Sequence, residues 1–275
     1  MDPEDEELWE IFDRSHLGRD RREHRVHERM KQMQDRGRQA PRRGRSLSRD
    51  EIVTAAIKVA DAEGSAAINM RRIARELNAG AMSLYWHVSS KDELLDMMLD
   101  AVEGGQQFPE ATGDWRADLH AAAWIQRTAL HQHQWLMDFI GGRPPLGPNT
   151  LRNLERSLAV IDNLGLDTFT ALNVLAAVGT YVMGAVLREF RETAVERRDQ
   201  EAAAGLSGSE FSEIVEGHVQ RLKANGRFPR FLRMYEEGID PDSPETRDER
   251  FEFGLQCVLD GIAARLAAQT DPQPG

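Results

Sequence analysis

The chain has 275 residues, of which 40% are hydrophobic, with a formal net charge of −11 at pH 7 and one cysteine. This length suggests two domains, and the composition is that of a soluble globular protein with enough apolar residues for a packed core. A single cysteine excludes an internal disulfide framework and any multi-cysteine zinc site, which favours a reducing compartment. The chain begins with acidic residues, unlike a signal peptide, and no apolar run reaches the roughly eighteen residues of a membrane span, so we expect a cytoplasmic protein.

The acidic net charge hides a basic stretch near the N-terminus. Between Arg21 and Arg49 there are eleven arginines or lysines and three acidic residues, whereas the first ten residues carry six carboxylates. Residues 1–46 are low in aliphatic side chains and end in Pro and Gly, so we expect a largely flexible N-terminal extension. A basic arm of this kind suits a DNA phosphate or a neighbouring groove. Its candidate DNA contacts, directly before the first expected helix, are Arg42, Arg43 and Arg45.

Residues 47–107 read as a small helical domain that begins and ends with a capped helix. Ser48 and Glu51 have the spacing of a capping box, and the helix that follows should end at Gly64. Ser90 and Glu93 repeat the capping box and begin a helix that runs to the Gly pair at 104–105. These two helices support the segment between them.

That segment, residues 69–91, has the pattern of a helix-turn-helix unit. Ile73 and Leu77 lie at helical spacing, Asn78 offers a left-handed stop, and Leu84 and Val88 resume the period. Small residues at the crossing allow two short helices to pack at a steep angle. The unit is basic, with Glu76 the one carboxylate among Arg71, Arg72, Arg75 and Lys91, so a phosphate backbone is its natural partner. A solvated corner that happens to carry arginines is the alternative reading of the bare pattern.

Residues 108–275 predict further helices and no strand, so the expected fold class is all-α. Apolar periods indicate helices from Asp114, over 151–161, from Asp167 to about residue 203, over 211–222 and over 251–266. The first of these breaks near residues 131–133, before a short apolar piece. Residues 141–149 read as an irregular connection, and residues 236–249 as an acidic loop.

The histidines and the single cysteine of this half are interpreted as structural residues. On a helix the rings of His131 and His133 would point about 200° apart, so they could not hold one ion together. We expect these two residues and His120 to be surface or core histidines rather than metal ligands. Apolar neighbours place Cys257 in the core rather than at a redox sensor.

The run LYWHV followed by SSKDELL, residues 84–95, closely resembles the end of the DNA-binding domain in the TetR family of bacterial repressors. The resemblance implies that Arg71 reads a base and that residues 81–83 begin the recognition helix. Asn69 departs from the small hydroxyl residue more usual at its position, and it is kept as a candidate contact. The remaining DNA-binding candidates that the resemblance implies are Ala81, Met82 and Ser83 on the recognition helix and Tyr85, His87 and Lys91 at phosphates.

The second half resembles the ligand domain of the tetracycline-repressor type, most clearly at residues 141–145, 176–190 and 251–261. In such relatives, the helices corresponding to 168–200 and 247–266 pack against their copies across a two-fold axis. The resemblance therefore implies a homodimer, with residues 108–275 serving ligand binding and dimerisation.

The same resemblance implies that the magnesium site of the tetracycline repressors is missing. Those relatives hold a magnesium-chelated drug through a His, a Thr and a Glu, where this chain has Phe139, Gly142 and Arg188. A phenyl ring and a guanidinium cannot ligate a hard cation, so we expect no metal, no other cofactor and an apolar or aromatic effector. Although such side chains more often belong to plain core, the candidate ligand-binding residues are Trp124, Phe139, Arg143, Leu154, Leu158, Leu175, Gly179, Thr180 and Arg188.

These features predict a ligand-responsive transcriptional repressor and not an enzyme. As a homodimer it would bind a palindromic double-stranded DNA operator, and a small-molecule inducer would release it. The same pattern would fit an activator. The alternative from another class is a small-molecule-binding protein or enzyme without DNA activity. The sequence has no phosphate-cradling Gly motif, nucleophile elbow or zinc-enzyme spacing to support catalysis.

Overall fold

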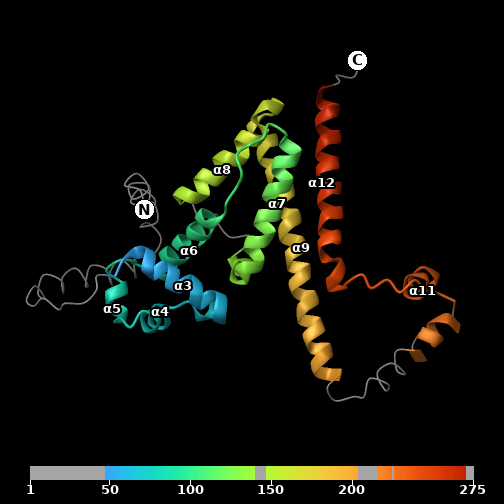
Figure 1. The fold of residues 1–275 in the computed structure, drawn as a ribbon, viewed down its shortest axis with the longest axis horizontal. Helices are drawn as coiled ribbons and strands as arrows, with labels where there is room; N and C mark the ends of the chain where they lie inside the picture. Colours follow the sequence, from blue (N-terminus) through green and yellow to red (C-terminus); the bar gives the residue numbers. More distant parts are fainter. Residues whose placement is uncertain (1–46, 140–146, 204–215, 218, 225, 271–275) are drawn as a thin grey trace, which may run out of the picture. The chain divides into compact units, whose positions relative to one another are not determined.

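The chain is helical throughout its described residues (Figure 1), which confirms the expected all-α fold. The computed structural model describes residues 47–139, 147–203, 216–217, 219–224 and 226–270. Within these ranges every regular element is an α-helix or a 3₁₀-helix. The chain divides into two compact units, one ending at Ala176 and the other beginning at Ala177. The extension expected at residues 1–46 lies outside the described residues.

The N-terminal part of the first unit is a bundle of short helices around one apolar core. Its elements are α3 (Arg49–Glu63), η1 (Ser65–Ala67), α4 (Met70–Glu76), α5 (Ala81–Leu84) and α6 (Lys91–Gly105). The side chains of Ile52, Ile73, Leu84, Leu94 and Met98 are fully buried in it. Burial of a side chain of this size contributes about 1.5–3 kcal/mol, so this core holds the four α-helices together.

Serine caps set the beginnings of α3 and α6. The Ser48 hydroxyl accepts from the Glu51 N–H and the Glu51 carboxylate accepts from the Ser48 N–H, so the predicted capping box is present. Ser90 caps α6 by accepting from the Glu93 N–H. The Glu93 carboxylate, however, accepts from the N–H and hydroxyl of Ser89. The predicted second capping box is therefore wrong in its return hydrogen bond, because Ser89 offers Glu93 two donors.

A left-handed residue forms the turn between α4 and α5. Asn78 has a φ of 50°, a conformation that asparagine tolerates better than most residues. Beyond the turn Leu84 and Val88 are 0% and 1% exposed. The predicted helix, tight turn and short second helix are confirmed.

The rest of the first unit consists of α7 (Trp115–Gln132), η2 (Gln134–Phe139), α8 (Pro148–Ile161) and η3 (Asp162–Leu164). Asp114 caps α7 by accepting from the N–H groups of Arg116 and Ala117, as the sequence predicts. The helix ends at the expected break, and the apolar piece after it is a 3₁₀-helix. Most of the connection predicted at 141–149 lies outside the described residues.

Half-buried polar side chains of Glu103 and Asn153 join α6 to α8. Asn153 of α8 donates through Nδ2 to both the backbone oxygen and the carboxylate of Glu103, each at 2.9 Å. Burial raises the pKa of the Glu103 carboxyl above its usual value of 4.5, against the lowering effect of the hydrogen bond from Asn153. The folded chain therefore binds this proton more tightly than the unfolded chain does.

The raised pKa of Glu103 gives a pH-dependent stability. Below the unfolded pKa the carboxyl is protonated in both states, and its contribution is fully present; that contribution is lost as pH rises through the folded pKa. Glu103→Gln keeps an acceptor for Asn153 and cannot ionise. We therefore expect the free energy of unfolding of Glu103→Gln, relative to the unsubstituted chain, to rise with pH in urea titrations. For Glu155→Gln, an exposed position on α8, the difference should stay constant, and equal behaviour of the two variants would contradict this assignment.

The second unit contains most of α9 (Thr168–Ala203), together with α11 (Pro229–Glu236), η4 (Pro244–Thr246) and α12 (Arg247–Thr270). The Tyr181 hydroxyl of α9 donates to the Phe251 backbone oxygen of α12 at 2.7 Å and the two rings are in contact. A side chain at Gly254 would overlap the Tyr181 ring, so this glycine permits the close approach of α9 and α12.

Three expectations for this half need correction. The loop predicted at 236–249 is shorter, because α12 begins at Arg247. Helix α11 was not expected, although a proline at its start and Arg233 in its last turn are helix signals. Cys257 is exposed rather than in the core, because it lies on the face of α12 opposite the buried Leu255 and Leu259. Of the helix predicted at 211–222, residues 211–215 lie outside the described residues, and residues 216–217 and 219–222 are helical.

The apolar character of α9 was also underestimated. Within Thr168–Ala194 of α9, an 18-residue window has a mean hydropathy of 1.7, so one described helix is long and apolar enough to cross a membrane by length and composition. No unbroken apolar run of span length occurs there, because Thr and Asn residues of α9 interrupt it. Only 22% of this helix window is buried within the single chain, which leaves a large apolar face of α9 without cover.

Candidate functional site

The DNA-contacting surface expected of the helix-turn-helix unit, here called the reading head, corresponds to the outward faces of α4 and α5. Arg71 is exposed on α4, and Met82 and Ser83 are exposed on α5, with Met82 at 54%. Ala81 is half-buried because it packs against the core. Trp86, which follows α5, is 53% exposed and was missing from the predicted site. Trp86 lies in the run LYWHV between the predicted contacts Tyr85 and His87, and this position could have indicated it as a further candidate.

The three arginines of α4 do not share one role. Arg72 donates through Nε to Glu63 of α3 at 2.9 Å and through Nη1 to Glu76 at 3.1 Å. This pairing lowers the pKa of the Glu63 carboxyl, chiefly through the hydrogen bond from Arg72. Glu76 is also paired with Lys58 of α3 at 2.8 Å. The sequence pattern missed Glu63 as a partner because it lies on another helix, and Arg72 is thus a structural residue that ties α4 to α3.

Arg71 and Arg75 of α4 are both exposed, and the family resemblance assigns the base contact to Arg71. It is exposed, and no ion pair engages it among the described residues. We expect Arg71→Ala to weaken operator binding by about 1–3 kcal/mol and to relax the preference at one base pair per half-site. Fluorescence anisotropy on operator and random duplexes measures both effects. Arg72→Ala is the matched control, and it should lower stability without changing the base preference. Equal weakening by Arg71→Ala on both duplexes would make Arg71 a phosphate contact instead.

The other predicted DNA contacts that the structure describes lie around the same reading head. One of them, Asn69, already makes hydrogen bonds within the chain. Asn69 caps α4, since its side chain accepts from the Arg72 N–H and donates to the Ala67 backbone oxygen. Tyr85 and His87 are half-buried, whereas Lys91 is exposed at the first position of α6. The predicted arm contacts Arg42, Arg43 and Arg45 lie outside the described residues.

The chain that follows α7 is clamped onto the DNA-binding core. Trp135 of η2 is 3% exposed in that core and donates through Nε1 to Asp61 of α3 at 2.8 Å. His133 Nδ1 lies 2.8 Å from the same carboxylate oxygen, and Ser65 of η1 donates to Asp138. Phe139, predicted to line the ligand site, stacks edge-on against Trp135 and packs against this core.

The other predicted ligand residues of the first unit are dispersed along three helices. Trp124 of α7 is half-buried, with the Arg127 guanidinium 5.0 Å from its ring. Leu158 of α8 and Leu175 of α9 are half-buried, whereas Leu154 is 42% exposed. Arg143 lies outside the described residues, as does Gly142 of the missing magnesium site.

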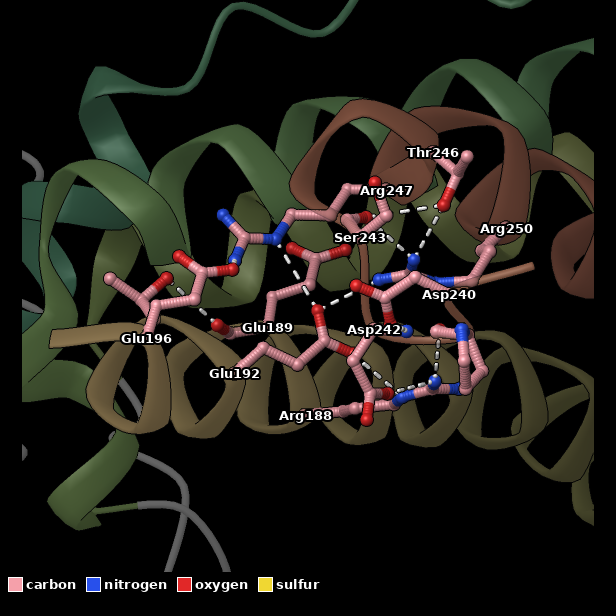
Figure 2. Close-up of polar contacts among 12 residues, drawn as sticks. Arg188, Glu189, Glu192, Glu196, Asp240, Asp242, Ser243, Thr246, Arg247 and Arg250 are labelled. Carbon is pink, nitrogen blue, oxygen red and sulfur yellow. Dashed lines mark hydrogen bonds and ion pairs between the residues drawn. The ribbon is translucent and has the colours of Figure 1, made fainter. Parts of the chain in front are cut away.

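Two of the remaining ligand candidates, Gly179 and Thr180, lie in the second unit on α9, and Gly179 is half-buried whereas Thr180 is exposed. The third, Arg188, belongs to an ion-pair network that holds α9 to the beginning of α12 (Figure 2). It contacts Glu192 at 2.8 Å and Asp242 at 2.7 Å. The hydrogen bond to Asp242 raises the pKa of Arg188.

Glu192 is the centre of that network. Its side chain is 5% exposed, and its Oε2 lies 3.3 Å from Arg247 Nε and 2.7 Å from Arg250 Nη2. Its Oε1 is within ion-pair distance of Arg188, although it accepts no hydrogen bond there. Figure 2 shows the three guanidiniums converging on this carboxylate. The charge of Arg188 is thus already balanced within the chain.

No metal site is evident within the described ranges, where no three His, Cys, Asp or Glu side chains come together in a way that could hold an ion.

Known proteins share both halves of this arrangement. Residues 52–98 match the family of bacterial regulatory proteins called tetR, and residues 108–266 match the tetracyclin repressor-like C-terminal domain. The HTH-type transcriptional repressor DrrR1 of Streptomyces coeruleorubidus is 36% identical over 81% of this chain and 79% of its own length. An HTH-type transcriptional regulator of Saccharopolyspora erythraea is 37% identical over 79% and 85%. Apo ActR from Streptomyces coelicolor, 29% identical, superposes with a TM-score of 0.63 over 82% of this chain and 99% of its own.

A helix-turn-helix unit followed by a helical ligand-binding domain defines a class of regulators of transcription. The chain belongs to the TetR family within that class, and it is a ligand-responsive transcriptional repressor.

Proposed function

We propose that two copies of this chain pair through α9 and α12, that the pair binds a palindromic operator, and that a small apolar or aromatic molecule releases it. The observation that carries the proposal is the exposed apolar face of α9 and α12. Each chain has one reading head, so a palindromic operator with two half-sites needs two chains. DNA binding makes the bacterial cytoplasm the expected location.

The pairing face is a stripe of apolar and small side chains. Phe169 of α9 is 77% exposed and Phe253 of α12 is 74% exposed, with Leu187 of α9 at 40%. A side chain built at Gly184 of α9 or Gly261 of α12 would meet no atom within 4 Å in the single chain. The fold of one chain therefore does not require glycine there, whereas two copies packing closely would use the space. Contiguous exposed apolar surface of this kind is typical of an interface.

Pairing supplies the geometry that an operator needs. A two-fold dimer presents two identical heads, which reach successive major grooves about 34–36 Å apart, so the preferred DNA should be palindromic. Met82 and Ser83 can contact thymine methyl groups and follow DNA shape, while Arg71 offers the bidentate contact.

An apolar or aromatic effector is supported by the chain's side chains and by one relative. The ligand candidates include Trp124 and Phe139, and the positions of the drug-bound magnesium carry no ligating side chain. ActR, at 30% identity, has been solved in complex with actinorhodin. The dimer would exist in two conformations, one whose reading heads have the spacing that the operator needs and one whose reading heads do not. A ligand that binds only the second conformation favours release from DNA. The free energy of this shift equals the difference in the ligand's binding free energy to the two conformations.

An electrophoretic shift tests the DNA-binding half of the proposal. The full chain should retard a duplex from the upstream region of its own gene and should not retard a scrambled duplex. A thermal-shift screen with aromatic and apolar molecules, actinorhodin included, then seeks compounds that stabilise the chain and abolish the shifted band. No retardation of any promoter duplex would overturn the proposal.

A further inference from the structure

The segment that joins α5 to α6 carries two of the predicted phosphate contacts. His87 follows α5, and Lys91 is the first residue of α6. Between them Val88 is 1% exposed and anchors the segment in the apolar core. The N–H groups of His87 and Val88 both donate to the Leu84 backbone oxygen at 2.9 Å. Contacts with the core and with α5 therefore hold one side of this segment.

Arg49 holds the same segment from α3. It is the first residue of that helix, and its Nε donates to the His87 backbone oxygen at 2.9 Å. Its Nη2 lies 3.8 Å from the carboxylate of Glu93 on α6. A hydrogen bond from an ionised donor is roughly twice as strong as one between neutral groups. One guanidinium therefore joins α3 to the backbone of the segment and to α6.

Glu93 completes the connection from α6. Its side chain is 11% exposed, and its Oε1 is the atom that faces Arg49. Its Oε2 accepts from the N–H of Ser89 at 2.5 Å and from the Ser89 hydroxyl at 2.6 Å. The carboxylate of Glu93 thus links Arg49 to Ser89, so the backbone of residues 87–89 is held at both ends.

Arg49 belongs by sequence to the basic N-terminal stretch that suits a DNA phosphate, but its contacts indicate another role. Its guanidinium already serves a backbone oxygen and a carboxylate. The residues that it holds are His87 itself and, through Ser89, the backbone that leads to Lys91. Arg71 lies on α4, and within the described residues no hydrogen bond or ion pair joins Arg49 to that helix.

We propose that Arg49 is a positioning residue for operator binding, which sets the backbone from His87 to Lys91 so that both side chains meet phosphates. The inference rests on the proposed function, and it adds a residue that does not itself contact DNA. A hydrogen bond to a phosphate oxygen needs a donor–acceptor distance of about 2.7–3.2 Å, so a backbone displacement of about 1 Å is enough to lose it.

The test is a double-mutant cycle on a duplex that the unsubstituted full chain selects from a random library. Arg49→Met removes the guanidinium and keeps an unbranched stem for packing. It is made in three backgrounds, which are the unsubstituted chain, His87→Ala with Lys91→Ala, and Arg71→Ala. Lys58→Met is the matched control, because it removes an exposed cation from the same helix whose ion-pair partner lies on α4.

We expect Arg49→Met to weaken binding about tenfold in the unsubstituted chain and in the Arg71→Ala chain. In the chain that lacks the side chains of His87 and Lys91, its effect should fall below about twofold, because no phosphate contact is left to position. Lys58→Met should change binding by less than about twofold in every background. A merely structural role of Arg49 would weaken binding equally in all three backgrounds.

Salt dependence separates positioning from direct contact. Each phosphate contact contributes about 0.9 to the slope of log affinity against log salt concentration. Arg49→Met should lower this slope in the unsubstituted chain, because it displaces Lys91. In the chain that lacks His87 and Lys91 it should leave the slope unchanged. A further drop of about 0.9 in that chain would show that Arg49 itself contacts a phosphate.

Three results would overturn the inference and leave the proposed function standing. They are equal weakening by Arg49→Met in all three backgrounds, the further drop in slope, and full binding by the chain that lacks the side chains of His87 and Lys91. Selection that recovers no duplex at all would instead contradict the proposed function, and the inference would fall with it.

Discussion

Replacing Phe253 with aspartate should split the proposed dimer into single chains. Burial of a phenyl group contributes about 1.5–3 kcal/mol, and two-fold symmetry makes the loss occur twice. Aspartate also adds two carboxylates to the interface, so we expect the proposed dimer to weaken by about 3–6 kcal/mol, or roughly 150- to 20,000-fold. Analytical ultracentrifugation over a concentration series measures this directly. Binding to a full palindrome should fall in parallel, because a single head contacts only one half-site.

Phe228→Asp is the matched control for that variant. Phe228 is 48% exposed, so it too is a solvent-facing phenylalanine, but it precedes α11 and lies on neither α9 nor α12. The control should leave the association state unchanged. A dimer that survives Phe253→Asp, or one that dissociates only with Phe228→Asp, would place the interface elsewhere.

Trp135→Ala should be the most destabilising single change in the first unit. Truncation of a buried tryptophan costs about 3–5 kcal/mol, and the loss of its N–H leaves Asp61 with one donor fewer. Urea unfolding of the full chain, followed by circular dichroism, gives the change in the free energy of unfolding. The change should reach the DNA-binding helices, because Trp135 lies in their core.

The matched control for the clamp is Trp86→Ala. Trp86 is 53% exposed, so its truncation should change the free energy of unfolding by about 0.5 kcal/mol or less. Trp135→Phe separates packing from hydrogen bonding, since it keeps most of the ring volume and removes the donor to Asp61. Similar unfolding midpoints for Trp135→Ala and Trp86→Ala would show that η2 is not part of the DNA-binding core.

Local signals in the sequence were enough to predict the helices of the reading head. The Ser48 cap, the left-handed Asn78 and the periodic Ile73 and Leu84 each depend on a few neighbouring residues, so their roles can be read from spacing. The family resemblance at residues 84–95 then gave the function. For these residues the expectation and the structure agree, whereas in the equally local Ser90–Glu93 pattern Ser89 takes the predicted return hydrogen bond.

Roles that depend on distant partners could not be read from the sequence. Arg72 was counted in the basic charge of the helix-turn-helix unit, whereas its guanidinium pairs with Glu63 of α3, 2.9 Å away. Arg188 likewise finds Asp242 more than fifty residues along the chain. Trp135 belongs to the DNA-binding core although it follows α7. In each case the deciding contact comes from an element that periodicity cannot place.

The central claim is that two copies of this chain act together on one palindrome. Selection of duplexes from a random library with the full chain, followed by native mass spectrometry of the enriched duplex, tests it most directly. The account predicts an inverted repeat whose half-sites lie about one helical turn apart, bound by two chains. Enrichment of a single unrepeated site bound by one chain would contradict it.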